Sequence, residues 1–488
     1  MNLKWGSMLA GLMIIGLVIG VMVRTEFIMA GWVILLFFII PTIGKPDLWW
    51  MATIATLGSG LSIGLPVDAT VHLMTMLGFV VLIMVKAWTS RMKAIPGFRT
   101  RNACVALVCI IIITASFRGW GLKILDSAYW GGMQYVCLLA ALLFYIYSGH
   151  VTLSFRQMNR TFVWFFLLAL VPAVALLIAH FVSHGDLIRN VVQIGGEEMN
   201  AMGSQLETPD VTRWAYMQYP AIWMGVLAIV LYDRKFSFSP AVMFVFALSF
   251  LMLGLSGHRT VVVLLGLTML VYVVIRRHSV RLSQYLRLLS ILILSVAGIY
   301  LFAEHLPLAF QRAFAWLPGI QVSYLAGIDA SSTSEWRIEL WKRLIPMIPD
   351  YLLLGRGMAF SVREFNDASG LISDRSTLHL VFIAVHLYHN GPLWFLIDLG
   401  MAGFIAGVVF MVGGIVHYGR KIKTLTEGSW WKSIFIVFYS FFVGYCVFFF
   451  AVIGGGTFLC HILVVASILE VIQRSAEAER LESLNQSG

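Results

Sequence analysis

Apolar runs long enough to cross a lipid bilayer recur along almost the whole of this 488-residue chain. A membrane-spanning helix needs about 17 to 25 apolar residues, and it satisfies its own backbone hydrogen bonds where no water is present. Charged residues make up 12% of the chain, against roughly 25% in soluble domains. The sequence therefore predicts an all-α polytopic membrane protein with about 12–14 transmembrane helices. The expected spans are 8–23, 28–43, 48–66, 71–88, 103–117, 131–148, 160–183, 214–232, 237–256, 260–275, 286–303, 391–418, 430–453 and 457–473.

Clusters of basic residues separate these runs and set the orientation that we expect. Cytoplasmic loops of membrane proteins carry an excess of Lys and Arg. With the N-terminus inside and the first helix uncleaved, every cluster falls on the cytoplasmic side, so this bias accounts for the net charge of +10 without nucleic-acid binding. The clusters are Arg91, Lys93, Arg99 and Arg101; Arg156 and Arg160; Arg234 and Lys235; Arg276, Arg277 and Arg281; and Arg420, Lys421 and Lys423.

The same topology places two long connections, 184–213 and 304–390, on the outer side. Long loops on a membrane scaffold are usually functional or disordered, and the second one has the pattern of an ordered amphipathic helix. Ser332 and Glu335 have the spacing of a capping box at its start, and apolar residues then recur at helical intervals from Trp336 to Ile348, with Pro346 and Pro349 indicating where the helix ends. We therefore expect four regions: residues 1–303 with transmembrane helices 1–11, residues 304–390 as an extracytoplasmic loop with amphipathic helices, residues 391–473 with the C-terminal transmembrane helices, and residues 474–488 as a cytoplasmic tail.

Three arginines on the expected outer side are candidates for binding an anion. Arg259 lies in a tight hairpin between two spans, where it either anchors to lipid headgroups or offers a guanidinium fork to a diphosphate. Arg337 lies on the amphipathic helix, and taken alone such a residue is more often a solvated surface charge. Arg356 lies between two glycines, in a turn that lets the backbone approach a ligand closely.

Three histidines, His379, His386 and His389, lie at the mouth of the apolar run that begins at Gly391. An imidazole can become protonated near neutral pH, and a charge at the entrance of a membrane span is costly. A histidine there therefore indicates either a bonded partner or a functional role. His389 is a structural residue bonded to a loop carbonyl, a metal ligand together with the other two histidines, or a general base. A metal site would be expected to include a carboxylate, and none accompanies these histidines in the sequence. A general base is favoured instead, because the candidate arginines are expected on the same side of the membrane.

The residues around His389 resemble the signature of the O-antigen ligase family of bacterial membrane glycosyltransferases. That signature here is His389, Asn390, nine intervening residues, Gly400, two further residues and Gly403. The wider pattern is similar too: Arg259 after the small residues Ser256 and Gly257, an outer loop with Ser334, Arg337 and Trp341, and then Pro349 and Gly355-x-Gly357. The resemblance covers residues 210–420, and the first half of the chain resembles the family only in being helical and apolar.

The resemblance implies a GT-C-like helical bundle with a long helical periplasmic loop, in the inner (cytoplasmic) membrane of a bacterium. It implies transfer of a glycan from undecaprenyl diphosphate to a lipid, glycan or protein acceptor on the outer side. Arg259 and Arg337 would hold the diphosphate and His389 would activate the acceptor hydroxyl, in an inverting reaction without a metal or other cofactor. The residues expected to support them are Arg356, His386, Asn390, Trp341 and His258.

Departures from the family pattern leave other functions open. His258 precedes Arg259 where the family more often has a small residue, and the chain has more expected helices than the family usually has. A polymerase that adds repeat units to a growing chain belongs to the same superfamily, and no residue separates it from a ligase. A transporter of lipid-linked oligosaccharide would instead carry charges near the bilayer midplane. A metal-dependent GT-C transferase would use an acidic residue such as Glu26 in the first outer loop.

Overall fold

The computed structural model resolves the chain into two compact units, each described here by itself. Unit 1 comprises residues 1–93 and 153–202, and unit 2 comprises residues 94–152 and 203–488. All candidate arginines and histidines belong to unit 2, so unit 2 contains the candidate site. The structure describes residues 45–59, 71–90, 99–121, 129–181, 217–235, 239–277, 290, 293, 297–361, 363, 366 and 378–487.

Unit 1 is built from apolar helices, of which α3 (Pro46–Thr56) packs against both α4 (Val71–Ser90) and α7 (Phe155–Leu168). A capping box begins α7, because the Ser154 side chain accepts from the Gln157 backbone N–H and the Gln157 side chain accepts from the Ser154 N–H. The single span expected over 160–183 is divided into α7 and α8 (Val171–Phe181). The expected spans 8–23 and 28–43, and Glu26, lie outside the described residues.

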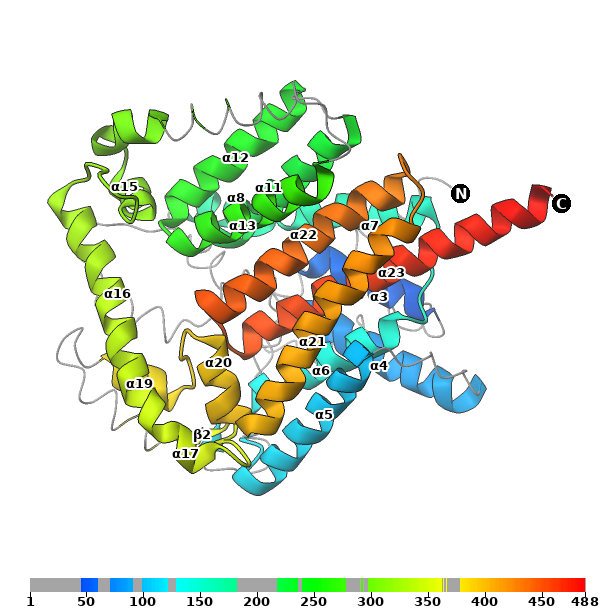
Figure 1. The fold of residues 1–488 in the computed structure, drawn as a ribbon, viewed down its shortest axis with the longest axis horizontal. Coiled ribbons are helices and arrows are strands. Elements are labelled where there is room, and N and C mark those ends of the chain that lie inside the picture. The colour runs from blue at the N-terminus through cyan, green and yellow to red at the C-terminus, as the bar shows by residue number, and fades with distance from the viewer. Residues whose placement is uncertain are drawn as a thin grey trace. The chain divides into compact units, whose positions relative to one another are not determined.

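Unit 2 contains long apolar helices that pack in pairs: α11 on α12, α13 on α22, α6 on α23 and α5 on α21 (Figure 1). Their bounds lie close to those of the expected spans, and six helices of the described chain are long and apolar enough to cross a membrane. The prediction of an all-α polytopic membrane protein is confirmed. The helices are α5 (Arg99–Arg118), α6 (Gly132–Ser148), α11 (Gln218–Lys235), α12 (Pro240–Ser256), α13 (Arg259–Arg276), α21 (Gly400–Lys421), α22 (Trp430–Ala451) and α23 (Gly456–Ser487). The expected tail after residue 474 continues α23, and half of the expected span 286–303 lies outside the described residues.

The helix ends of unit 2 form two groups, as a bundle of alternating up and down spans requires. Contacts within the first group join helix ends that the sequence assigns to the cytoplasm: Arg101 with Glu470, Arg276 with Ser433, and Lys421 with Glu477. Contacts within the second group join ends that the sequence assigns to the outer side: Arg118 with Gly355, Arg259 with Ala330, and Gly391 with Gly454. The candidate site lies in this second group.

A buried ionic cluster ties α11 to α13 in the first group. Asp233 is 1% exposed and accepts hydrogen bonds from the Arg276 guanidinium, from Nε at 2.8 Å and Nη2 at 2.5 Å, and from the Tyr272 hydroxyl at 2.5 Å. Buried charges persist only when they are paired and hydrogen-bonded. Both oxygens of this carboxylate are paired, so the cluster acts as a structural lock between two helices.

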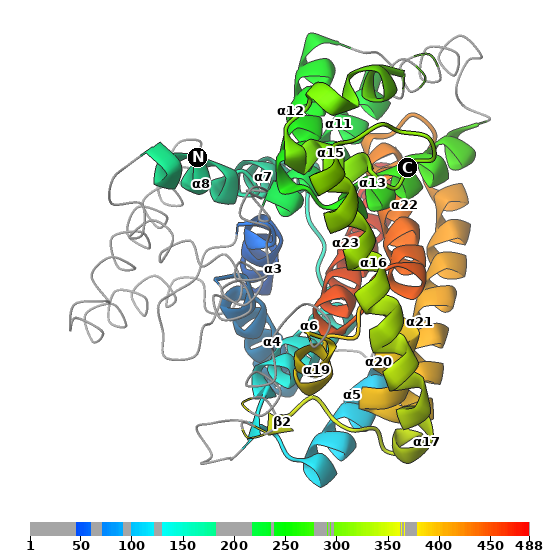
Figure 2. The same cartoon turned by 90° about the vertical axis from the view of Figure 1, so that its left-hand side faces the viewer.

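The long connection that the sequence assigns to the outer side is helical over much of its described length. Helix α16 (Tyr324–Leu344) contacts α15 (Leu308–Phe314) at one end and α19 (Leu378–Ala384) in its second half (Figure 2). A 3₁₀ turn (Ile345–Met347) and α17 (Ile348–Tyr351) follow it. A two-residue strand β2 (Phe360–Ser361) then pairs antiparallel with β1 (Tyr129–Trp130), so a segment before α6 holds the end of the loop.

The expected start of the amphipathic helix at Ser332 is wrong. Helix α16 begins eight residues earlier, where the Ser323 side chain accepts from the Ala326 backbone N–H at 3.4 Å. Ser323 competes with Ser332 as an N-cap, and the structure extends the helix through the intervening small polar residues. The helix ends at Leu344, before Pro346, as the sequence indicates.

Candidate functional site

The histidine signature folds into a loop followed by an irregular helix start. Asn390 is the N-cap of α20 (Gly391–Trp394), since its Oδ1 accepts from the Leu393 N–H at 3.0 Å, and Pro392 lies in the first turn. Five residues of π-helix (Phe395–Leu399) then lead into α21. Asn390 therefore contacts the backbone of the next helix rather than the histidines.

Gly400 in the signature lies against the turn that contains Gly355 and Gly357. Its φ of 71° is in the left-handed region, and a Cβ there would lie 2.9 Å from the carbonyl oxygens of Leu352 and Leu353. Only glycine meets both requirements without strain. The second signature glycine, Gly403, is buried in α21.

The π-helix leaves two carbonyl oxygens to partners outside the helix. The backbone N–H of Arg356 donates to Ile397 at 2.6 Å, and that of Gly357 donates to Asp398 at 3.0 Å. The Arg356 guanidinium donates to the Ile383 carbonyl at 2.7 Å, at the end of α19. Arg356, expected as a possible supporting residue, thus connects the signature helix to the helix that precedes the histidine loop.

His389 stands at the end of this loop with its ring held on several sides. Its Nδ1–H donates to the Leu387 carbonyl at 3.0 Å, which leaves the lone pair on Nε2. The ring meets Trp336 and Phe382 edge to face, at centroid distances of 5.1 and 5.2 Å, and those two rings stack on each other at 4.8 Å. No described residue is hydrogen-bonded to Nε2. His389 is thus a neutral, oriented imidazole with one unoccupied acceptor nitrogen.

Two arginines from distant parts of the chain act on this site through their charges. Burial among its neighbours and the charge of Arg337 lower the pKa of His389 to about 4. Burial and the charge of Arg259 likewise lower the pKa of Arg337 to about 10. The Nε of Arg337 is buried and has no hydrogen-bond partner among the described residues, and Arg259 donates to the Ala330 carbonyl at 2.9 Å. The charge of Arg337 thus acts on His389, and the charge of Arg259 acts on Arg337, an arrangement in which a bound anion would be stabilised.

The three histidines do not converge on one point. His386 is 1% exposed, and its Nδ1 lies 2.8 Å from Oδ1 of Asp398, which also accepts from the Tyr388 hydroxyl at 2.9 Å. His379 is buried on α19. The sequence interpretation that no carboxylate accompanies these histidines is wrong, because Asp398 pairs with His386. Within the described ranges, no three His, Cys, Asp or Glu side chains are grouped to hold a metal ion.

Asp398 is the residue of this site that the sequence interpretation missed. It lies nine residues after His389, inside the run LWFLIDLG. An acidic residue in an apolar membrane segment is a signal for function in its own right.

Two further residues expected to support the site lie on its edge. Trp341 of α16 donates from Nε1 to the Tyr388 carbonyl at 2.9 Å, so it holds the histidine loop. His258 is the N-cap residue of α13, and its backbone N–H donates to the Ser256 hydroxyl at 3.2 Å. His258 therefore shapes the turn before Arg259.

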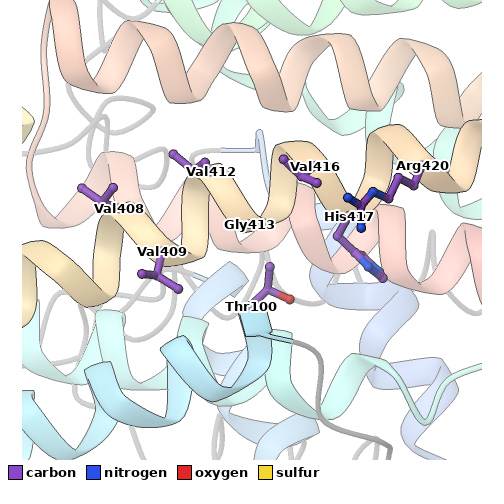
Figure 3. Close-up of a pocket in the computed structure, with 8 residues that line it drawn as sticks. All are labelled: Thr100, Val408, Val409, Val412, Gly413, Val416, His417 and Arg420. Carbon is purple, nitrogen blue, oxygen red and sulfur yellow. The ribbon is translucent and has the colours of Figure 1, made fainter.

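A groove of about 680 Å³ runs along the second half of α21, away from this cluster (Figure 3). Its first lining residue on α21, Val408, lies roughly 12 Å along the helix axis from Gly400, at 1.5 Å per residue. Four of its eight lining residues are valines of α21, so the groove suits hydrocarbon rather than the reaction. Its lining residues are Thr100, Val408, Val409, Val412, Gly413, Val416, His417 and Arg420.

Comparison with known families agrees with this geometry. Residues 244–408 match a family model described as O-antigen ligase. The matched segment runs from α12 into α21 and includes Arg259, Arg337 and His389. No curated protein matches the chain. The match covers about a third of the chain, and it supports the resemblance to the O-antigen ligase family for this segment.

Proposed function

We propose that this multi-pass membrane protein is a glycosyltransferase that moves a glycan from undecaprenyl diphosphate to an acceptor hydroxyl. The reaction would take place at the outer face of the bacterial cytoplasmic membrane. The observation that carries the proposal is the unoccupied Nε2 of His389 on a ring that feels the charge of Arg337, an arginine that in turn feels the charge of Arg259. A base and a concentration of positive charge are the two requirements for displacing a diphosphate leaving group.

The donor diphosphate would bind at the two arginines. Arg259 is the first residue of α13, where the helix dipole and the first backbone N–H groups favour an anion. The buried Nε of Arg337 offers a donor without a partner in the described structure. A guanidinium fork binds two phosphate oxygens at once, so this pair would orient the donor as well as hold it.

The acceptor would be activated by His389. Its Nε2 would take the hydroxyl proton as the acceptor oxygen attacks the anomeric carbon, and the bond from that carbon to the diphosphate oxygen would break on the opposite side. The configuration at the anomeric carbon would therefore invert. The two arginines would stabilise the charge that develops on the departing diphosphate, which is why we propose a reaction that needs no metal ion.

The low pKa of His389 fits a base that is switched on by the donor. In the free protein, the nearby Arg337 charge and burial keep the pKa near 4. A bound diphosphate would offset the charge of Arg337 and raise the pKa of His389. The imidazole would then become a better proton acceptor only when a glycan donor is in place.

The test is transfer by purified full-length protein in lipid nanodiscs, supplied with an undecaprenyl-diphosphate-linked oligosaccharide and candidate acceptors. The wild type should form a glycosylated acceptor, whereas a ladder of lengthened glycan without acceptor would identify a polymerase. His389→Ala should abolish transfer. His417→Ala, a histidine substitution in the groove on α21, is the control and should retain it. Unchanged transfer by His389→Ala would refute the proposed base.

A further inference from the structure

Asp398 connects two residues of the loop that precedes His389. One of its oxygens, Oδ1, lies 2.8 Å from Nδ1 of His386 and 2.9 Å from the Tyr388 hydroxyl. All three side chains are at most 1% exposed. Because the two bonded residues flank Leu387, a single carboxylate oxygen holds both sides of that residue.

Leu387 supplies the carbonyl that orients the His389 ring. The Nδ1–H of His389 donates to this carbonyl at 3.0 Å, and the bond determines which ring nitrogen keeps its lone pair. A rotation of the Leu387 peptide would break the bond and free the ring. The position of the Leu387 carbonyl therefore decides whether Nε2 points to where an acceptor would bind.

The loop backbone is strained at both ends of this segment. His386 has φ of 61° and His389 has φ of 52°, in the left-handed region that residues other than glycine rarely adopt. Such conformations persist only where surrounding contacts over-determine them, and they concentrate at functional sites. The bonds from Asp398 to His386 and Tyr388 are contacts of this kind.

Asp398 is itself fixed by the fold. Its backbone carbonyl accepts from the Gly357 N–H at 3.0 Å, and a Cβ on Gly355 would lie 2.3 Å from the same carbonyl oxygen. Its second carboxylate oxygen, Oδ2, is buried and has no hydrogen-bond partner in the described part of the chain. Both oxygens of the structural carboxylate Asp233 are paired. A half-satisfied buried carboxylate is a poor stabilising device, which favours a role in the site.

We infer that Asp398 is a positioning residue that, through His386 and Tyr388, holds the Leu387 carbonyl in place and so keeps His389 oriented as the base. This inference rests on the proposed function of His389. It assigns to the acidic residue inside the signature a role in the reaction without contact with substrate.

The first test measures the His389 ring and needs no substrate. Full-length protein in nanodiscs is treated with diethyl pyrocarbonate, which reacts with neutral imidazole, and modification of His389 is followed by mass spectrometry from pH 3.5 to 8. In the wild type, the labelling rate of His389 should fall to half its maximum near pH 4. This is the pKa of His389 as lowered by burial and by the charge of Arg337. In Asp398→Asn and Tyr388→Phe, we expect the His389 ring to be released from its buried position. The pH at which its labelling rate is half-maximal should then move from about 4 toward 6.5.

Asp233→Asn is the matched control, because it makes the same substitution at another buried carboxylate of unit 2. It should lower the unfolding temperature and leave the midpoint of His389 unchanged. Tyr388→Phe keeps the aromatic ring and removes only the hydroxyl, so it tests the inference even if Asp398→Asn fails to fold.

The second test separates the inference from the proposed function. In the transfer assay, Asp398→Asn should lower kcat by about tenfold or more while KM for the lipid-linked donor stays within about twofold, because the arginines are untouched. Wild-type protein without any transfer activity would overturn the proposed function, and the labelling result would still decide the positioning role. The inference would be overturned if Asp398→Asn and Tyr388→Phe kept the wild-type labelling midpoint of His389 and lost no more transfer activity than Asp233→Asn does. Asp398 would then have only a structural role.

Discussion

The indole N–H of Trp341 donates to the backbone carbonyl of Tyr388 at 2.9 Å. This bond joins α16, which carries Arg337, to the loop that ends at His389. The two halves of the proposed site, the arginine that would bind the donor and the base that would activate the acceptor, are thereby tied to each other at a fixed separation.

Trp341→Phe should lower transfer while the protein stays folded. Phenylalanine keeps an aromatic ring but loses the N–H, and a lost hydrogen bond of this kind costs about 1 kcal/mol. We expect kcat to fall by roughly five- to tenfold, because the loop can then move relative to Arg337. Trp316→Phe is the control: it removes an indole bond to the Ala313 carbonyl on α15 and should leave transfer unchanged. Equal activity of both variants would contradict a positioning role for Trp341.

Arg259→Lys should raise KM for the lipid-linked donor. Lysine keeps the charge but cannot offer two parallel donors to a diphosphate, so we expect KM to rise by about tenfold or more. Arg343→Lys makes the same change on α16, at an exposed residue paired with Glu339, and should have little effect. If Arg259→Lys bound the donor as well as wild type, Arg259 would be an anchor to lipid headgroups.

The sequence predicted most of the fold because its main signal is local. About 20 consecutive apolar residues define a span without reference to the rest of the chain, and the bounds of α12, α13 and α22 lie within a few residues of expectation. The division of the expected span 160–183 into α7 and α8 has a local marker as well, because Pro172 lies at the break and a proline interrupts a helix. The start of α16 was misplaced since two serines compete as caps and only the folded chain decides between them.

The site could be predicted in part. The resemblance to the O-antigen ligase signature singled out His389 and Gly400, and the expected topology put Arg259 and Arg337 on the same side of the membrane. The pairing of Asp398 with His386 depends on a π-helical segment that turns the carboxylate back toward the loop. A π-helix of five residues has no recognisable periodicity in the sequence. Likewise, the left-handed backbone of His386 and His389 reflects contacts made by several distant segments.

The pH dependence of transfer should reveal the charge of Arg337. His389 acts as a base only when neutral, so kcat/KM falls as pH falls through the pKa of His389 in the free protein, which burial and Arg337 hold near 4. Removing the charge in Arg337→Gln should raise this pKa toward 6.5 and move the acidic limb of the profile to higher pH. Lys342→Gln removes an exposed charge on the same helix and should not move it. A limb that stays in place in Arg337→Gln would mean that Arg337 does not act on His389.

Gly400→Ala should destabilise the protein through the backbone alone. The methyl group would meet the Leu352 and Leu353 carbonyl oxygens at 2.9 Å, and the residue would keep φ near 71°. Clash and strain together should cost about 1–3 kcal/mol, and the shift of the π-helix should also disturb Asp398. Gly266→Ala in α13 is the matched control, since no neighbouring atom lies within 4 Å of the added methyl and alanine favours the helix by about 1 kcal/mol. Thermal unfolding in nanodiscs should therefore show a lower midpoint for Gly400→Ala and an equal or higher one for Gly266→Ala. Equal unfolding midpoints for the two variants would mean that the turn at Leu352 moves to accommodate the methyl group. The requirement for glycine at position 400 would then not be steric.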